Sequence, residues 1–183
     1  MFLTRVTLLK AEALRRGFRD PYDWHKALWR CFHDVKSRPF LFRIDEESES
    51  FRVFMQSSIS PLVQPWGSWE MKTLPAPHLS HETYAFSFRA NTEKRDFHSH
   101  ARVPVQDPTA WLARVSAERG FEIVSVSVTR TCEVYCRGYK HALTDFNGVL
   151  KVSDREKFVD AVSNGIGSAK YAGFGLLLVR KHN

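Results

Sequence analysis

A glycine-rich segment near the C-terminus, residues 165–175, constrains the fold more than any other part of the sequence. Glycine permits positive φ and lets a ligand approach the backbone, and successive N–H groups in such a loop suit a phosphate. The apolar run 174–179 does not alternate, which predicts a strand buried on both faces. We therefore expect a helix-to-strand loop that binds an anionic backbone through Gly165, Gly167, Lys170, Gly173 and Gly175.

Two common phosphate loops are excluded by the residues around Lys170. A P-loop needs Ser or Thr after the Gly-Lys pair, whereas Tyr171 follows Lys170. A dinucleotide fingerprint needs a third glycine where Lys170 stands, and it opens a helix after a strand. The plain alternative is a flexible turn, but four glycines with one lysine favour a binding loop.

The composition indicates a globular chain with an anionic partner. The net charge is +7 and the isoelectric point is about 9.5, which points most often to nucleic acid. Three cysteines are too few for a disulfide framework and suggest a reducing compartment. No apolar run reaches the ~20 residues of a membrane span, and the first residues lack a signal-peptide pattern. We expect a cytoplasmic protein.

The first half of the chain predicts one ferredoxin-like unit. Alternating apolar residues predict strands over 2–9, 40–44, 51–57 and 82–91, with a basic connection over 10–19. Asp20 and Pro21 are typical of a helix start. A short helix is expected over 66–72, in place of a full second helix.

The second half repeats this order. A short strand over 103–105 precedes a helix capped by Asp107, strands over 121–129 and 146–152, and a helix capped by Ser153. The expected fold is therefore α+β, with two tandem ferredoxin-like domains. We place them at residues 1–90 and 103–183, joined by a basic linker over 91–102.

The first helix carries a candidate acid–base site. At about 100° per residue, Tyr22, His25 and Trp29 share one helix face, beside Lys26. An imidazole and a phenol together could transfer protons. The alternative is an ordinary helix surface with half-buried aromatic rings.

No metal or other cofactor is expected. Cys132 and Cys136, followed by His141, give too few ligands for a structural zinc, and the cysteines suit small buried positions better. His98 and His100 could hold a metal, but no carboxylate or cysteine pattern completes that site.

Four motifs together resemble a known family. They are the Tyr-x-x-His helix at residues 22–29, the segments 88–92 and 146–152, and above all the glycine loop. They resemble the CRISPR repeat-RNA endoribonucleases of the Cascade system, in the repeat-associated RNA-processing (RAMP) superfamily. The loop departs from the family pattern at Ala169, where the family usually has Gly.

The resemblance implies both a fold and an activity. It implies tandem ferredoxin-like domains and metal-independent cleavage at the 3′ base of the repeat hairpin. The products would be a 2′,3′-cyclic phosphate and a 5′-OH, and the guide RNA would stay bound in a surveillance complex with other subunits. Catalysis would fall to His25, with Tyr22 assisting.

Basic residues supply the remaining site predictions. Lys26 or Arg30 would stabilise charge on the phosphorane. Two rivals stay open: a non-catalytic RNA-binding subunit of this fold, and a metabolic ferredoxin-like domain whose loop binds a nucleotide. The candidate RNA contacts, besides the glycine loop, are Arg89, Lys94, Arg95, Arg130, Arg137 and Lys140.

Overall fold

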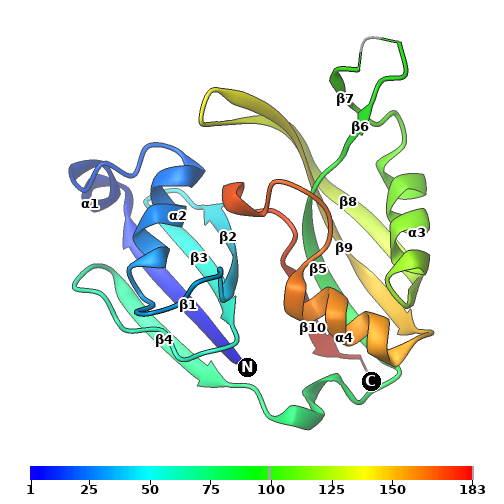
Figure 1. Cartoon of the computed structure of the whole chain (residues 1–183), viewed down its shortest axis with the longest axis horizontal. Coiled ribbons are helices and arrows are strands. Elements are labelled where there is room, and N and C mark those ends of the chain that lie inside the picture. Colours follow the sequence, from blue (N-terminus) through cyan, green and yellow to red (C-terminus); the bar gives the residue numbers. More distant parts are fainter. Residues whose placement is uncertain (99, 183) are drawn as a thin grey trace.

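The computed structural model describes residues 1–98 and 100–182 and shows two four-stranded antiparallel sheets side by side (Figure 1). Each pairs its strands in the same order, with the fourth strand beside the first and the third between the first and the second. This is the ferredoxin-like order, so the α+β prediction of tandem ferredoxin-like units is confirmed. The first sheet, in the order β2-β3-β1-β4, contains β1 (Phe2–Leu9), β2 (Phe40–Glu46), β3 (Ser50–Ser57) and β4 (Ser68–Thr73).

The second sheet has longer strands. Its order is β10-β5-β9-β8, and β8 and β9 form a long hairpin. A separate two-stranded ribbon, β6 (Glu93–Arg95) with β7 (Arg102–Pro104), follows β5. The sheet strands are β5 (Thr83–Asn91), β8 (Phe121–Cys136), β9 (Tyr139–Val152) and β10 (Leu177–Lys181).

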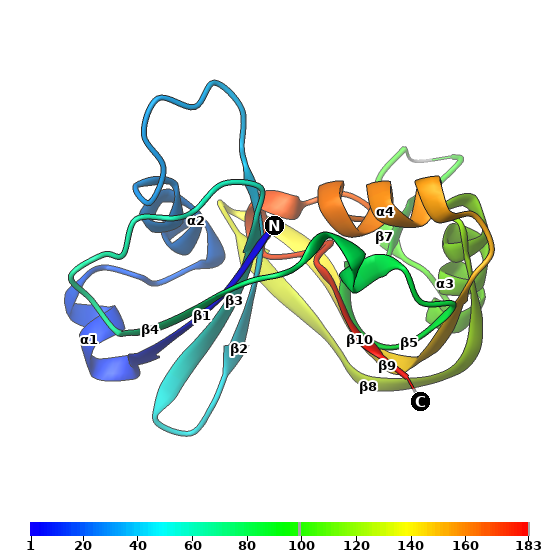
Figure 2. The ribbon, with the colours of Figure 1, turned by 90° about the horizontal axis from the view of Figure 1, so that it is seen from below.

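The helices lie over the faces of the two sheets, and α4 leads into the glycine loop between them (Figure 2). Among the described helices, none combines the length and apolarity that crossing a bilayer requires. The helices are α1 (Lys10–Arg15), α2 (Pro21–Trp29), α3 (Pro108–Glu118) and α4 (Arg155–Asn164), with short 3₁₀ turns η1 (Ala76–Leu79) and η2 (Lys170–Ala172).

The strand predicted over 82–91 forms, as β5, but not in the first sheet. It pairs with β9 and β10 and is the first strand of the second sheet. The first sheet is completed by β4, where a short helix was expected, and the strand over 103–105 forms only the small ribbon. Backbone pairing with β1 overrides local helix preference here. We propose that the boundary between the units lies between β4 and β5.

Three element predictions in the second half and one in the first differ in their limits. The strand predicted over 121–129 continues to Cys136, because Cys132, Val134 and Cys136 alternate with exposed residues. Helix α4 is capped by Asp154, and β10 begins only at Leu177. The basic connection over 10–19 contains α1.

Each sheet has its own apolar core. Trp24 and Leu28 of α2 pack on Phe42 of the first sheet, while Phe88 and Phe158 lie in the core of the second. Burial of each such side chain stabilises the fold by about 1.5–3 kcal/mol.

A buried ion cluster joins the two sheets. Arg89 of β5 donates to both oxygens of Asp145, at 2.7 and 2.8 Å, and to Asp45 of β2 at 3.0 Å. It also donates to the carbonyl of Ile44. The guanidinium is therefore a structural link between the units, and the prediction that Arg89 contacts RNA is corrected: its donors are already engaged inside the protein.

Candidate active site

Helix α2 has a well-defined start that places Tyr22 and His25. The Asp20 side chain accepts hydrogen bonds from the backbone N–H of Tyr22 at 2.7 Å and of Asp23 at 3.1 Å. Asp23 returns the contact to the Asp20 N–H, which completes a capping box. Because the apolar stripe faces the core, the neighbouring stripe with His25 lies at the seam between the two units.

Aromatic rings surround the His25 imidazole. Tyr22 stacks on it with ring centroids 5.7 Å apart, and Phe40 and Phe42 of β2 lie at 5.7 and 6.0 Å. Burial, aided by the positive charge of Arg38, lowers the pKa of His25 to about 4. The imidazole is therefore neutral near pH 7, as a proton acceptor must be.

The two imidazole nitrogens of His25 differ in their hydrogen bonding. Nε2 accepts a hydrogen bond from the indole N–H of Trp29 at 3.0 Å. Nδ1 is buried and has no hydrogen-bond partner within the described residues.

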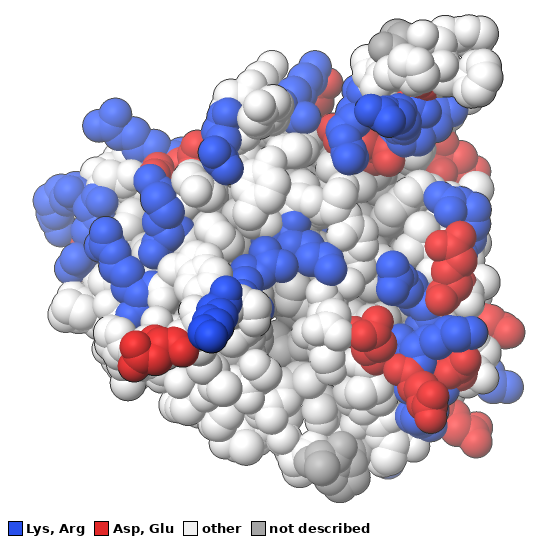
Figure 3. Space-filling view, in the orientation of Figure 1, with Lys and Arg blue, Asp and Glu red and all other residues white. Residues whose placement is uncertain are grey.

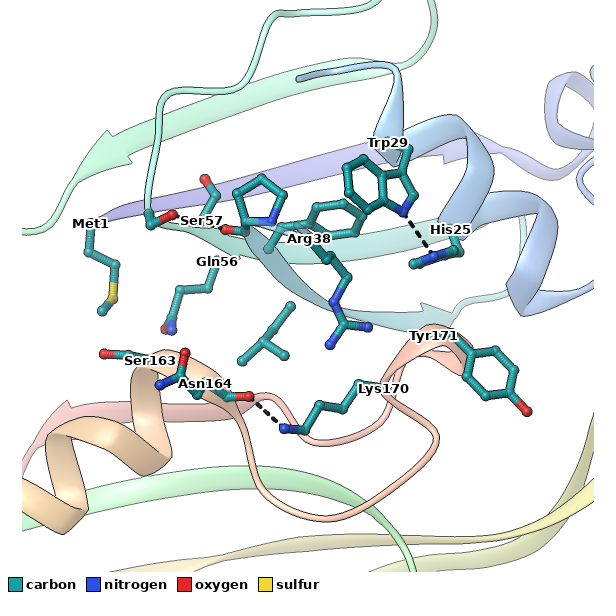
Figure 4. Close-up of a pocket in the computed structure, with 14 residues that line it drawn as sticks. Met1, His25, Trp29, Arg38, Gln56, Ser57, Ser163, Asn164, Lys170 and Tyr171 are labelled. Atoms are coloured by element: carbon teal, nitrogen blue, oxygen red, sulfur yellow. Dashed lines mark hydrogen bonds between the residues drawn. The ribbon is translucent and has the colours of Figure 1, made fainter. Parts of the chain in front are cut away.

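An open cavity of about 730 Å³ lies beside His25, between β2 and the end of α4 (Figure 4). Arg38 and Lys170 reach toward it from opposite walls. No Asp or Glu is among its lining residues, which include His25, Trp29, Gln56, Asn164 and Tyr171. Two cations without a carboxylate make the cavity suited to an anion.

The two cations differ in their partners. Lys170 Nζ donates to the Asn164 carbonyl at 2.7 Å, and burial together with Arg38 lowers the pKa of Lys170. Burial also lowers the pKa of Arg38, which makes no hydrogen bond or ion pair with any residue in 1–98 or 100–182. The guanidinium of Arg38 is therefore free to bind a phosphate bidentately.

The structure brings some predicted residues together and separates others. Tyr22 and His25 are adjacent, as the helical spacing indicated. Lys26 instead forms an ion pair with Asp23 at 2.9 Å, and Arg30 is exposed; neither lines the cavity. Arg38 occupies the position expected of them. Sequence reasoning missed it, although it stands two residues before Phe40, where the strand that carries Phe40 and Phe42 begins.

The tip of the β8–β9 hairpin reaches the start of α2. The Arg137 guanidinium lies 4.5 Å from the centre of the Tyr22 ring, and its backbone N–H donates to Asp20 at 3.3 Å. The hairpin thus holds an exposed cation next to Tyr22.

The other predicted RNA contacts lie on the surface. Lys94, Arg95 and Arg130 are exposed, and Lys140 is exposed but paired with Glu133 at 2.5 Å. In Figure 3, some basic side chains lie in the middle of the face, between the two units, and others lie toward its edges, where most of the acidic side chains also are. Surface ion pairs of this kind are weak, so Lys140 can exchange its partner for phosphate.

The glycine loop has structural as well as exposed positions. A Cβ on Gly165 would lie 2.9 Å from the Gly175 carbonyl oxygen and from the Leu41 side chain, so this glycine is needed for packing. Gly167 faces open space. Ala169 adopts a left-handed φ of 56°, a conformation that favours the glycine usual in the family pattern.

The predicted absence of a metal site is not tested by the structure. Within residues 1–98 and 100–182, no group of three or more His, Cys, Asp and Glu side chains could hold an ion. Cys136 is buried, and burial raises its pKa to about 11, while His141 pairs with the Tyr171 hydroxyl at 3.1 Å.

Known proteins resemble this chain over nearly its whole length. It is 28% identical to the CRISPR system Cascade subunit CasE of Escherichia coli, with 97% of this chain and 98% of that protein covered. It is 27% identical to the CRISPR-associated endoribonuclease Cse3 of Thermus thermophilus, with 98% and 99% covered.

Solved structures of similar proteins superpose on this chain over nearly its whole length. The Thermus thermophilus Cse3 bound to an RNA representing a pre-cleavage complex superposes with a TM-score of 0.84, at 27% identity, with 98% of each chain covered. The CRISPR-associated protein Cas6e from Escherichia coli gives a TM-score of 0.75 at 26% identity, again with 98% of each chain covered. A family model described as CRISPR associated protein matches residues 1–181. The chain therefore belongs to this family of CRISPR-associated proteins.

Proposed function

We propose that this protein is an endoribonuclease that cleaves CRISPR repeat hairpin RNA and keeps the product guide RNA within a surveillance complex. Relatives of this chain are a Cascade subunit and an endoribonuclease, and a structural neighbour holds RNA before cleavage. Related structures also include an RNA-guided surveillance complex, at 27% identity and with 98% of this chain covered. The prokaryotic cytoplasm is the proposed location.

One observation carries the proposal: a neutral histidine stands beside a cavity that offers two cations and no carboxylate. The negative charge of a phosphodiester would pair with Arg38 and Lys170, which face no carboxylate among the described cavity residues. The ribose hydroxyl next to this phosphate would then lie near the His25 imidazole, which can accept its proton. None of the described residues that line the cavity is an Asp, Glu or Cys, so the proposed nucleophile comes from the RNA.

Cleavage forms one phosphorus–oxygen bond, breaks another and requires two proton transfers. The ribose 2′-oxygen attacks the adjacent phosphorus and loses its proton to a base, and the bond from phosphorus to the 5′-oxygen breaks. The 5′-oxygen takes a proton, and the products are a 2′,3′-cyclic phosphate and a 5′-OH. His25 performs one of the proton transfers and Tyr22 assists, while Arg38 and Lys170 stabilise the phosphorane. No metal takes part in this scheme.

The hairpin itself is bound by shape and charge. Base-paired RNA displays phosphates and 2′-hydroxyls, which exposed lysines and arginines contact without reading the sequence. Because each neutralised phosphate releases counterions, affinity should fall steeply with salt. The proposed contacts are Lys94, Arg95, Arg130, Arg137, Lys140 and the exposed part of the glycine loop.

Single-turnover cleavage of the repeat hairpin in EDTA tests the proposal. The wild-type protein should cut, and His25→Ala should cut about 10²–10⁴-fold more slowly while binding the hairpin nearly as well. His33→Ala is the matched control, because His33 is exposed just beyond the same helix. Wild-type cleavage rates in His25→Ala would assign the chemistry elsewhere, and cleavage that returns only with Mg²⁺ would overturn the metal-free scheme.

A further inference from the structure

The hydrogen bond between Trp29 and His25 has a chemical direction. An indole N–H only donates, so Nε2 of His25 must present its lone pair, and the single proton of the neutral ring lies on Nδ1. Nδ1 is buried and has no partner among the described residues, so it cannot reach a substrate. Nε2 is therefore the only nitrogen through which this imidazole can act, and Trp29 occupies it.

We propose that Trp29 covers Nε2 of His25, the nitrogen that acts as the general base, in the free protein and yields its place to the ribose 2′-OH. The inference rests on the proposed ribonuclease function. The indole N–H and the 2′-OH are both donors to the same lone pair, so one can replace the other. His25 then takes the 2′-OH proton on Nε2 and becomes an imidazolium that already carries its Nδ1 proton.

The packing indicates which of the two rings moves. The His25 ring is held by Tyr22, Phe40 and Phe42, all with centroids within 6.0 Å. The Trp29 ring is only partly buried: it packs at the edge of the first core, with the Phe40 ring at 5.8 Å, and it also lines the cavity with Arg38 and Lys170 (Figure 4). A rotation of the partly buried indole therefore frees Nε2 while the three rings that hold His25 stay in place.

The charges around His25 favour this order of events. Tyr22 faces it from its own helix, Arg38 from the segment before β2, and Lys170 with Tyr171 from η2. These side chains are two cations and two phenols, with no carboxylate among them, so the free protein disfavours a protonated ring. An RNA phosphate between Arg38 and Lys170 supplies the missing negative charge and raises the proton affinity of His25.

The first test needs no RNA. Nitrogen NMR of the imidazole in the free protein should show the proton of His25 on Nδ1. In Trp29→Phe, which keeps a ring but loses the donor, the proton should shift partly to Nε2 and the pKa of His25 should rise. Trp69→Phe is the matched control, because it removes an indole N–H that donates to the Trp66 carbonyl at 2.6 Å, outside the cavity. A wild-type ring with its proton on Nε2 would overturn the inference.

The second test uses cleavage. If Trp29 must be displaced, Trp29→Phe should raise kcat/KM by about three- to tenfold, because the competing bond is absent. The wild-type rate at saturating RNA should rise with pH and level off, as for a base. A rate that falls as pH rises, or a loss of kcat/KM in Trp29→Phe, would contradict the role. A wild-type protein that does not cleave would refute the proposed function but leave the NMR result standing.

Discussion

The two units meet in two regions of opposite electrostatic character. In one, Arg89 is buried between Asp45 and Asp145, so its charge is balanced within the protein. In the other, Arg38 is half-buried beside Lys170 and His25, and none of the described residues that line the cavity is acidic. A buried cation is costly without a counterion, so the first region is a structural joint and the second is completed only by an anionic ligand.

The largest effect is expected when the balanced charge, that of Arg89, is removed. Arg89→Leu should lower the free energy of unfolding by about 3–5 kcal/mol, because Asp45 and Asp145 would keep their negative charges in a partly buried site. Chemical denaturation measures the loss. Arg114→Leu serves as control, since its ion pair with Glu118 is exposed and should be worth only about 0.3–0.5 kcal/mol. Equal losses in the two variants would mean that Arg89 is not a structural link.

The second change removes the unbalanced charge, that of Arg38 in the cavity. Arg38→Gln should slow single-turnover cleavage about ten- to a hundredfold, because one donor to the phosphorane is lost. Its free energy of unfolding should not fall, since the guanidinium has no partner to lose among the described residues. Lys36→Gln, an exposed lysine two residues away, should keep its rate. An Arg38→Gln protein that is destabilised yet cleaves at full rate would reverse the assignment.

A smaller test compares two glycines of the loop. Gly165 and Gly167 both have positive φ, but only Gly165 packs tightly, against Gly175 and Leu41. Gly165→Ala should cost about 2–3 kcal/mol of stability, and Gly167→Ala about 1 kcal/mol from backbone strain alone. If Gly167→Ala weakens hairpin binding more than it lowers the melting temperature, that glycine is the RNA contact. Equal effects on stability would remove the packing distinction.

The sequence predicted the local elements well and their partners less well. Alternation and capping located α2 and the strands around it, because those signals depend on neighbouring residues. The sheet that β5 joins depends on pairing with β9 and β10, which no local pattern encodes. The same holds for Arg89, whose two carboxylates come from distant strands.

In the candidate site, too, the sequence predicted the residues that are neighbours on one helix but not those that the fold brings together. Tyr22 and His25 share a helix face, so their spacing alone indicated that they would be adjacent. Arg38 and Lys170 come together only because β2 and the glycine loop line one cavity. The contact of Trp29 with Nε2 depends on side-chain rotamers, which the spacing of one turn permits but does not determine.

The pairing of β10 with β5 also bears on how the protein is made. The first sheet can close once β4 has left the ribosome, but β5 must wait for β9 and β10. During that interval Phe86 and Phe88 lack their native cover, so an unfinished chain is prone to aggregate. Lys170 and the loop wall join His25 only when the last strand docks. A stalled or truncated chain thus contains the histidine helix but has no completed cavity, and no competence to cut RNA.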